Sequence, residues 1–180
     1  MWSTWSTTSP PPWSADVGKR FSRSADSEVD VETVYRVLSG PDWAAQRRAA
    51  LGDDSELVSR VETADGGVTL AISRAVPAGG PGFLHKLLPS NPRVTTTDIW
   101  GPSVDGVRRA TWSAVLSGTP ASLRGTMTIE PTPTGNRYTI DGEVRVGLPL
   151  IGGKAESFIA DQLVHLAAAE ARVVRQVLNA

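Results

Sequence analysis

Residues 137–178 read RYTIDGEVRVGLPLIGGKAESFIADQLVHLAAAEARVVRQVL, and this stretch decides the fold class. Between residues 137 and 146, polar side chains alternate with apolar or small ones, which predicts a strand with one buried and one solvated face. Residues 154–178 contain neither proline nor glycine and repeat their apolar side chains at helical spacing, which predicts a long amphipathic helix. A half-buried strand that leads into a long helix favours an α+β domain.

Upstream of this stretch, the sequence predicts a series of strands that end at turn signals. The predicted strands cover residues 21–25, 57–63, 68–76, 94–100, 107–116 and 123–130. Asp65-Gly66 and Asp105-Gly106 are typical of hairpin connections, because such turns need backbone conformations that aspartate and glycine adopt readily. Consecutive strands joined in this way predict an antiparallel meander rather than alternating strand–helix units.

Two short helices are predicted after the first strand. Asp30 is placed to cap one helix, and Asp42 is placed to cap a second helix at residues 43–51. The two helices have the shape of a helix-turn-helix, but Arg47 and Arg48 are their one pair of adjacent basic residues. A helix that reads DNA normally carries more positive charge, so nucleic acid is not expected as a partner.

Residues 1–18 differ in composition from the rest of the chain, and we expect them to form a flexible leader to a single domain at residues 19–180. The leader contains three tryptophans among serines and threonines, and three consecutive prolines that favour an extended course. It lacks the basic start and apolar block of a secretory signal. Three interpretations stay open: the leader is disordered, it is an upstream extension from a misplaced start codon, or its tryptophans dock on the domain or on a partner.

The strand series is interrupted at residues 78–91. A glycine- and proline-rich run at residues 79–82 is followed by the apolar segment FLHKLL at residues 83–88. We expect an ordinary crossover loop here, with a lid over the interior of the domain as the alternative.

The order of one strand, two short helices, a strand series and a long C-terminal helix resembles the helix-grip fold over residues 19–180. The junction LPLIGGKAE at residues 148–156 is similar to that of a small actinobacterial family of unknown function. That family belongs to the START-like, polyketide-cyclase-like (SRPBCC) superfamily. The resemblance implies a curved antiparallel sheet of about six or seven strands around the long helix. It also implies a cavity between sheet and helix that takes a hydrophobic ligand.

Composition argues against several classes of function. The chain has 18 basic and 19 acidic side chains and a formal net charge of -1, which disfavours electrostatic binding to nucleic acid or to a membrane surface. With no cysteine and two histidines that lack metal-ligand spacing, neither a metal site nor a cofactor is expected. The glycines at residues 147–153 have the wrong spacing for a phosphate-binding loop, and no G-x-S-x-G nucleophile turn occurs, so no catalytic residue is assigned.

No apolar run approaches the roughly 20 residues that a membrane-spanning helix needs. Together with the absence of a secretory signal, this favours a cytoplasmic protein without an integral membrane segment. The sequence does not indicate an oligomeric state.

Two charged residues fall on faces that are otherwise apolar. Arg74 continues the face of Val68, Leu70 and Ile72, and Glu170 lies within the apolar stripe of the long helix. An isolated buried charge is very unfavourable. We therefore expect that each of the two side chains pairs inside the domain, with the other as a candidate partner, or reaches the open end of the sheet. The alternative is that one or both anchor the polar group of a bound molecule in an apolar pocket.

The predicted cavity wall combines these two charges with aromatic and aliphatic side chains. It consists of Arg74, Trp100, Trp112, Met127, Tyr138, Ile140, Leu163, Leu166 and Glu170. For the two tryptophans, a place in the core alone is the favoured interpretation. Small residues on the inward faces of adjacent strands, such as Gly125 and Gly142, are expected to leave a pocket of several hundred cubic ångströms.

These features favour a non-enzymatic protein that binds a hydrophobic small molecule or lipid. One alternative is an enzyme of the cyclase or aromatase kind, in which Arg74, Glu170 or Asp98 polarises a bound polyketide. Another is a protein-interaction module that uses the outer face of the sheet or the tryptophan-rich leader. An enzyme needs two or more acid–base groups that converge in the cavity, whereas an interaction module can have a filled core and an exposed apolar patch.

Overall fold

The computed structural model describes residues 18–76, 81–82 and 88–179. In chain order, the elements are β1 (Lys19–Ser27), α1 (Val31–Leu38), α2 (Trp43–Leu51), β2 (Glu56–Glu62), β3 (Val68–Ala75), β4 (Arg93–Trp100), β5 (Arg108–Leu116), β6 (Ala121–Thr132), β7 (Gly135–Val146) and α3 (Gly152–Leu178). The predicted leader, apart from Gly18, and most of the predicted lid or crossover loop lie outside the described residues.

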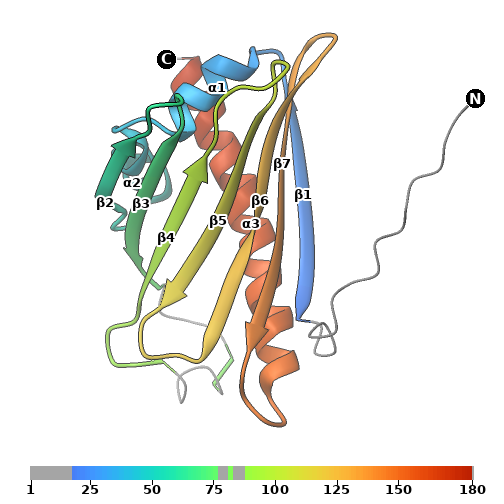
Figure 1. The fold of residues 1–180 in the computed structure, drawn as a ribbon. Helices are drawn as coiled ribbons and strands as arrows, with labels where there is room; N and C mark the ends of the chain where they lie inside the picture. Colours follow the sequence, from blue (N-terminus) through green and yellow to red (C-terminus); the bar gives the residue numbers. More distant parts are fainter. Residues whose placement is uncertain (1–17, 77–80, 83–87, 180) are drawn as a thin grey trace, which may run out of the picture.

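The strands form one antiparallel sheet in the order β1-β7-β6-β5-β4-β3-β2. β2 to β7 make the predicted meander, and β1 pairs with β7 at the far edge. The sheet is curved, α3 runs along its concave side, and α1 lies across one end (Figure 1). The predicted α+β helix-grip architecture is confirmed.

Local sequence signals set several of the element boundaries. Asp30 caps α1 as predicted, because its side chain accepts a hydrogen bond from the backbone N–H of Thr33 at 2.9 Å. Asp42 precedes α2 but makes no capping bond, so this part of the prediction is wrong. Its backbone already has helical angles, whereas a capping side chain needs an extended backbone.

The long helix α3 begins at Gly152, slightly before the predicted start at Lys154. A Cβ atom at Gly152 would lie 2.6 Å from the carbonyl oxygen of Val146. The close approach of the helix start to the end of β7 therefore requires glycine at this position.

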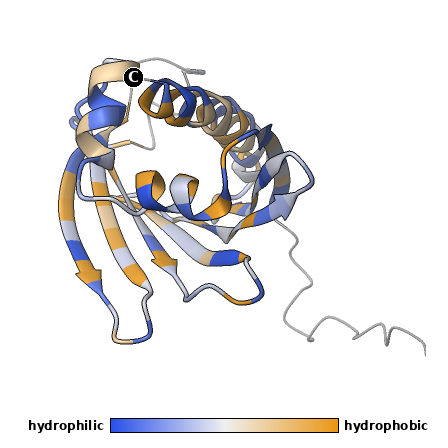
Figure 2. Cartoon of the chain, turned by 90° about the horizontal axis from the view of Figure 1, so that it is seen from above, coloured by the Kyte–Doolittle hydropathy of each residue, from blue (hydrophilic) through white to orange (hydrophobic). Residues whose placement is uncertain are grey.

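The strand register places one row of side chains from each strand on the concave face. Leu70, Asp98, Trp112 and Gly125 form one such row across β3 to β6, because neighbouring members lie directly opposite each other. The buried strand residues lie mainly on this face, whereas Ile99 on the outer face is 52% exposed. Figure 2 shows α1 and α3 on the concave side of the curved sheet.

α1 closes one end of the concave face. The ring of Tyr35 meets that of Trp100 edge to face, with centroids 5.6 Å apart. The guanidinium of Arg108 stacks 3.9 Å from the centroid of the Tyr35 ring and binds both carboxylate oxygens of Glu32, at 2.9 and 2.8 Å. Aromatic packing and a bidentate ion pair therefore hold α1 on the sheet.

α3 packs mainly against β1, β7, α1 and α2 rather than against β3, β4 and β5. The side chains of the apolar stripe of α3 are therefore buried to different degrees. Ala160 and Ala167 at one margin of the stripe are buried, whereas Ile159, Leu163 and Leu166 at its centre are only half-buried. The centre of the stripe therefore faces the concave side of the sheet without being fully covered by it.

Candidate functional site

The nine residues predicted for the cavity wall fall into two groups. Trp100, Trp112 and Met127 are buried and belong to the hydrophobic core. The others are half-buried, come from β3, β7 and α3, and comprise Arg74, Tyr138, Ile140, Leu163, Leu166 and Glu170. The half-buried group is the part of the predicted wall that a bound molecule could reach.

The ring of Trp112 lies where the sequence predicts an empty pocket beside Gly125 and Gly142. A Cβ atom at Gly125 would lie 2.7 Å from Nε1 of Trp112, and one at Gly142 would lie 2.6 Å from Cζ2 of the same ring. The indole N–H donates to the carbonyl oxygen of Asp141 at 3.0 Å. The two glycines therefore make room for an aromatic side chain, and the prediction that they leave an empty pocket is wrong.

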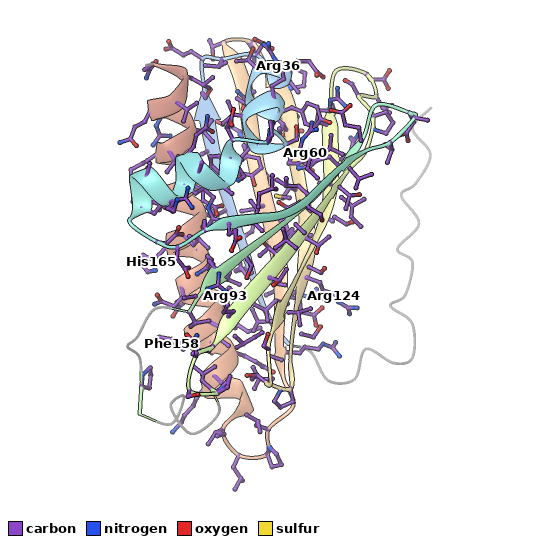
Figure 3. All side chains as sticks on the ribbon, turned by 90° about the vertical axis from the view of Figure 1, so that its left-hand side faces the viewer. Arg36, Arg60, Arg93, Arg124, Phe158 and His165 are labelled. Atoms are coloured by element: carbon purple, nitrogen blue, oxygen red, sulfur yellow. The ribbon has the colours of Figure 1, made fainter. Side chains whose placement is uncertain are left out.

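Two hollows in the described part of the chain bear on the predicted cavity. One lies between β1, β7 and α3, is lined in part by Tyr138 and Ile140, and measures about 120 Å³, which is less than the several hundred expected. The other measures about 540 Å³ and lies on the outer face of the sheet, where Ile99 and Arg124 help to line it. Figure 3 shows Arg124 on the side of the sheet away from α3.

Glu170 lies on the stripe of α3 that faces the sheet, but its ion-pair partner is not the predicted one. Nη2 of Arg47 lies 3.1 Å from Oε1 of Glu170 and 3.8 Å from Oδ2 of Asp53. No carboxylate of a described residue lies within 4.0 Å of the Arg74 guanidinium. The predicted Arg74–Glu170 pair is wrong, because the packing of α2 on α3 brings Arg47 to Glu170 instead.

Arg47 is a site residue that the sequence pattern did not identify. It is only 3% exposed, because it shares one side of α2 with the buried Trp43. The spacing of these two residues, one helical turn apart, is the signal that could have found it. Nε and Nη2 of Arg47 make no hydrogen bond to a described residue, since the contact with Glu170 lies outside hydrogen-bonding geometry.

Arg74 lies on the concave face near the end of β3, opposite Val94. Burial, followed by the positive charge of Arg47, lowers the pKa of its guanidinium, and the charges of Glu170 and Asp53 partly oppose this shift. Arg74 and Arg47 are therefore near enough to repel each other across the interior.

Asp98 occupies the middle of the concave face, between Leu70 and Trp112 of the neighbouring strands. Burial, followed by the negative charge of Glu170, raises the pKa of its carboxyl to about 7, while Arg47 lowers it. A carboxyl with such a pKa can exchange a proton near neutral pH. Among the expectations from sequence, Asp98 belonged only to the enzymatic alternative.

Tyr138 completes the set of polar side chains on this side of the sheet. Burial, followed by the charges of Glu170 and Asp98, raises the pKa of its hydroxyl well above the usual value, so the phenol stays protonated. Its hydroxyl hydrogen-bonds Sδ of Met127 at 3.0 Å. We call the five electrostatically linked residues the interior polar cluster: Arg47, Arg74, Asp98, Tyr138 and Glu170.

Neither histidine belongs to the cluster as far as the structure describes them. His165 is exposed on the side of α3 away from the sheet (Figure 3), and His85 lies outside the described residues. Within the described ranges, no grouping of histidine and acidic side chains is suited to hold a metal ion. No helix in the described part of the chain has the length and apolar character needed to cross a membrane.

Comparison with known proteins identifies the family. The model of a family described as "Protein of unknown function (DUF2505)" matches residues 22–178. The chain belongs to the DUF2505 family. Its relatives include uncharacterised proteins of Mycobacterium tuberculosis and Mycobacterium bovis, each 29% identical over 162 residues that make up 86% of this chain and 93% of the relative.

Solved structures share the fold of this DUF2505 protein. A STAR-related lipid transfer protein from Xanthomonas axonopodis matches with a TM-score of 0.61 at 18% identity, over 89% of this chain and 86% of that one. Norcoclaurine synthase from Thalictrum flavum matches with a TM-score of 0.52 at 15% identity, over 100% and 99% of the two chains. These likenesses show the fold, and they agree with the helix-grip architecture predicted from the sequence.

Proposed function

We propose that residues 19–180 form a cytoplasmic domain that binds a hydrophobic small molecule or lipid between the concave face of β3–β5 and the centre of the α3 stripe. The observation that carries the proposal is the interior polar cluster, set among apolar side chains that are only half-buried. An apolar site with a few converging polar groups is typical of a small-molecule pocket.

The energetics of the α3 stripe support this assignment. Leu163, Leu166 and Ile159 lie at the centre of the stripe yet keep part of their surface accessible. Covering apolar surface gains about 25 cal/mol per Å², so a hydrocarbon ligand laid along these side chains would be held by the same effect that holds the core. The proposed contacts are Arg74, Tyr138, Ile140, Leu163, Leu166 and Glu170, to which the structure adds Arg47 and Asp98.

Two of the solved structures with this fold support the same class of function. One protein of similar fold is described as a STAR-related lipid transfer protein and another as norcoclaurine synthase. We infer that this chain uses the concave side of the same fold for a hydrophobic molecule, and that its specific chemistry resides in the interior polar cluster.

A pair of neighbouring substitutions on β4 tests the proposed location. Thr96 is half-buried on the concave face, opposite Ile72 and Ala114, whereas Thr95 is half-buried on the outer face, opposite Ser73 and Val115. Thr96→Phe should fill the interior and abolish binding of a neutral fluorescent lipid probe such as Nile red. Thr95→Phe adds the same volume on the other side and should leave binding unchanged.

Both variants are first compared with the wild type by circular dichroism and thermal unfolding. If Thr96→Phe does not fold, Leu163→Phe on α3 places the same bulk opposite β4. The proposal is wrong if the folded inner-face variant binds the probe as the wild type does, or if the wild type binds no apolar probe and yields no retained lipid in native mass spectrometry.

Catalysis on the bound molecule is a second candidate, and one observation favours it. Asp98 has a pKa raised to about 7 and shares the interior with the protonated phenol of Tyr138. Two such groups could move a proton in a cyclisation of a poly-β-ketone substrate. Mass spectrometry can follow the conversion of such a substrate. The Asp98→Asn variant should lose this conversion and still bind Nile red. If the wild type does not convert the substrate, the catalytic candidate is wrong and ligand binding alone is the proposed function.

A further inference from the structure

The interior polar cluster contains two guanidinium groups that lack matching acceptors. Arg47 is 3% exposed, and its Nε and Nη2 atoms donate no hydrogen bond to a described residue. A guanidinium presents five N–H donors in a rigid fork, and leaving them unpaired in the interior is unfavourable. The buried end of α2 therefore presents unused donors to the space beside α3.

The second guanidinium has no carboxylate partner among the described residues. Arg47 has Glu170 at 3.1 Å and Asp53 at 3.8 Å, whereas Arg74 has no such group within 4.0 Å. Burial and the charge of Arg47 both disfavour the charged form of Arg74, which lowers its pKa. An anion near both groups would satisfy the free donors of Arg47 and relieve the repulsion between the two arginines.

We propose, on the basis of the function proposed above, that the ligand carries an oxyanion head group, a carboxylate or a phosphate, which Arg47 and Arg74 bind together. The hydrocarbon tail then lies along Leu163 and Leu166 on α3 and along the concave face of β4. Glu170 and Asp53 lie beside Nη2 of Arg47 and hold the side chain in position, but neither accepts a hydrogen bond from Nε or Nη2, which leaves these donors to the ligand.

Carboxylates already balance the two positive charges of this site in number, so the unpaired donors of the guanidinium groups, and not the net charge, select an anion. The interior has two positive charges, Arg47 and Arg74, against the carboxylates of Glu170 and Asp53 and the Asp98 carboxyl. Binding of an oxyanion therefore favours the protonated form of Asp98, which then has no charge to repel the head group. A cationic head group would find no acceptor on either guanidinium, because arginine only donates hydrogen bonds.

Three ligands with the same tail and different head groups test the proposal: hexadecanoic acid, hexadecyl phosphate and hexadecan-1-ol. Binding to the full chain is measured by quenching of tryptophan fluorescence or by displacement of Nile red. At least one of the two anions should bind about tenfold more tightly than the alcohol, since hydrogen bonds between charged groups are worth this much. The anion with the higher affinity identifies the head group as carboxylate or phosphate.

The Arg74→Gln variant separates the contribution of the head group to the binding affinity from that of the hydrocarbon tail. It should remove most of the preference for the anion and leave the affinity for the alcohol unchanged. Arg48→Gln is the matched control, because Arg48 is exposed on α2 beside Arg47 and should have no effect. If Arg74→Gln does not fold, Arg74→Lys keeps the charge without the fork and should retain only part of the preference.

The outcomes distinguish this proposal from the proposed function. Equal binding of acid, phosphate and alcohol, or an anion preference that survives in folded Arg74→Gln, overturns the head-group assignment while ligand binding stands. If none of the three compounds binds and Nile red does not bind either, both proposals are wrong.

Discussion

The contact between Arg47 and Glu170 links α2 to α3 through two largely buried charges. The Arg47 side chain is 4% exposed and that of Glu170 is 18% exposed. Glu170→Gln removes the nearest counter-charge of Arg47 and should lower the free energy of unfolding by about 3 kcal/mol. Urea denaturation measures this loss.

Glu62→Gln is the control for this prediction. Glu62 pairs with Arg60 at 2.8 Å, but its side chain is 70% exposed, so the loss of that pair should have little effect on stability. Equal stability of Glu170→Gln and the wild type would show that Arg47 is compensated by another group, such as Asp53.

Asp98 should make stability depend on pH near neutrality. Its pKa is about 7 in the folded protein against 3.8 for an aspartate carboxyl free in water, with burial as the main cause. Between these values the folded state holds a proton that the unfolded state has released, so stability falls as pH rises from about 4 to about 7 and then levels off. The total loss is up to about 4 kcal/mol.

Asp98→Asn replaces the protonated carboxyl by a neutral group of the same shape. This variant should be more stable than the wild type at pH 8, and the difference should shrink at pH 5. Denaturant midpoints of both proteins at the two pH values check this, and parallel pH profiles of the two proteins would contradict it.

At the residue scale, the sequence shows which charged side chains interrupt an apolar face, but it does not show which residue is the ion-pair partner of each. Arg74 and Glu170 stand out because each breaks an apolar face, and the structure places both at the interior. The partner of Glu170 is Arg47, more than a hundred positions away in the chain, and only the packing of α2 on α3 brings them together. The spacing of residues within one helix or strand cannot show which residues of a distant element lie next to it in the folded chain.

The two short helices provide a matched test of capping. Asp30 accepts a hydrogen bond from the N–H of Thr33, whereas Asp42 makes no capping bond. Asp30→Ala should therefore lower the thermal midpoint of unfolding, and Asp42→Ala should leave it nearly unchanged. Equal effects of the two substitutions in thermal scans would show that the capping bond contributes nothing to stability.

A second prediction at the scale of whole elements concerns the leader, residues 1–18. Residues 1–15 lack helical or strand periodicity, so their deletion should leave the thermal midpoint unchanged. A loss of several degrees would show that Trp2, Trp5 or Trp13 packs on the domain.

Elements were predictable from sequence because their patterns are local. Alternation in residues 137–146 and the turn signals at Gly66 and Gly106 correspond to β7 and to the two hairpins. Space inside the fold was not predictable in this way. Gly125 and Gly142 suggested an empty pocket, but the ring of Trp112 on β5 lies against Gly125, and the rings of Trp112 and Phe21 both lie against Gly142.

In the whole molecule, α3 packs closely on β1 and β7, whereas it covers the concave face of β3–β5 less completely. α3 is held on β1 and β7, and α1 is held by Tyr35 and Arg108, so the helices stay in place without contact along the full width of the sheet. A ligand that binds only the folded state adds stability in proportion to the logarithm of its concentration. Thermal midpoints should therefore rise with added hexadecanoic acid, and should not rise for Thr96→Phe.

Photolabelling tests the location of the ligand most directly. A long-chain acid and the matching alcohol, each with a diazirine in the tail, are bound to the full chain, irradiated, and mapped by peptide mass spectrometry. We expect labels on Leu163 and Leu166 of α3 and on concave-face residues of β4 such as Thr96. Labels on the outer face, at Ile99 or Val115, or no label above that of a denatured control, would contradict this expectation.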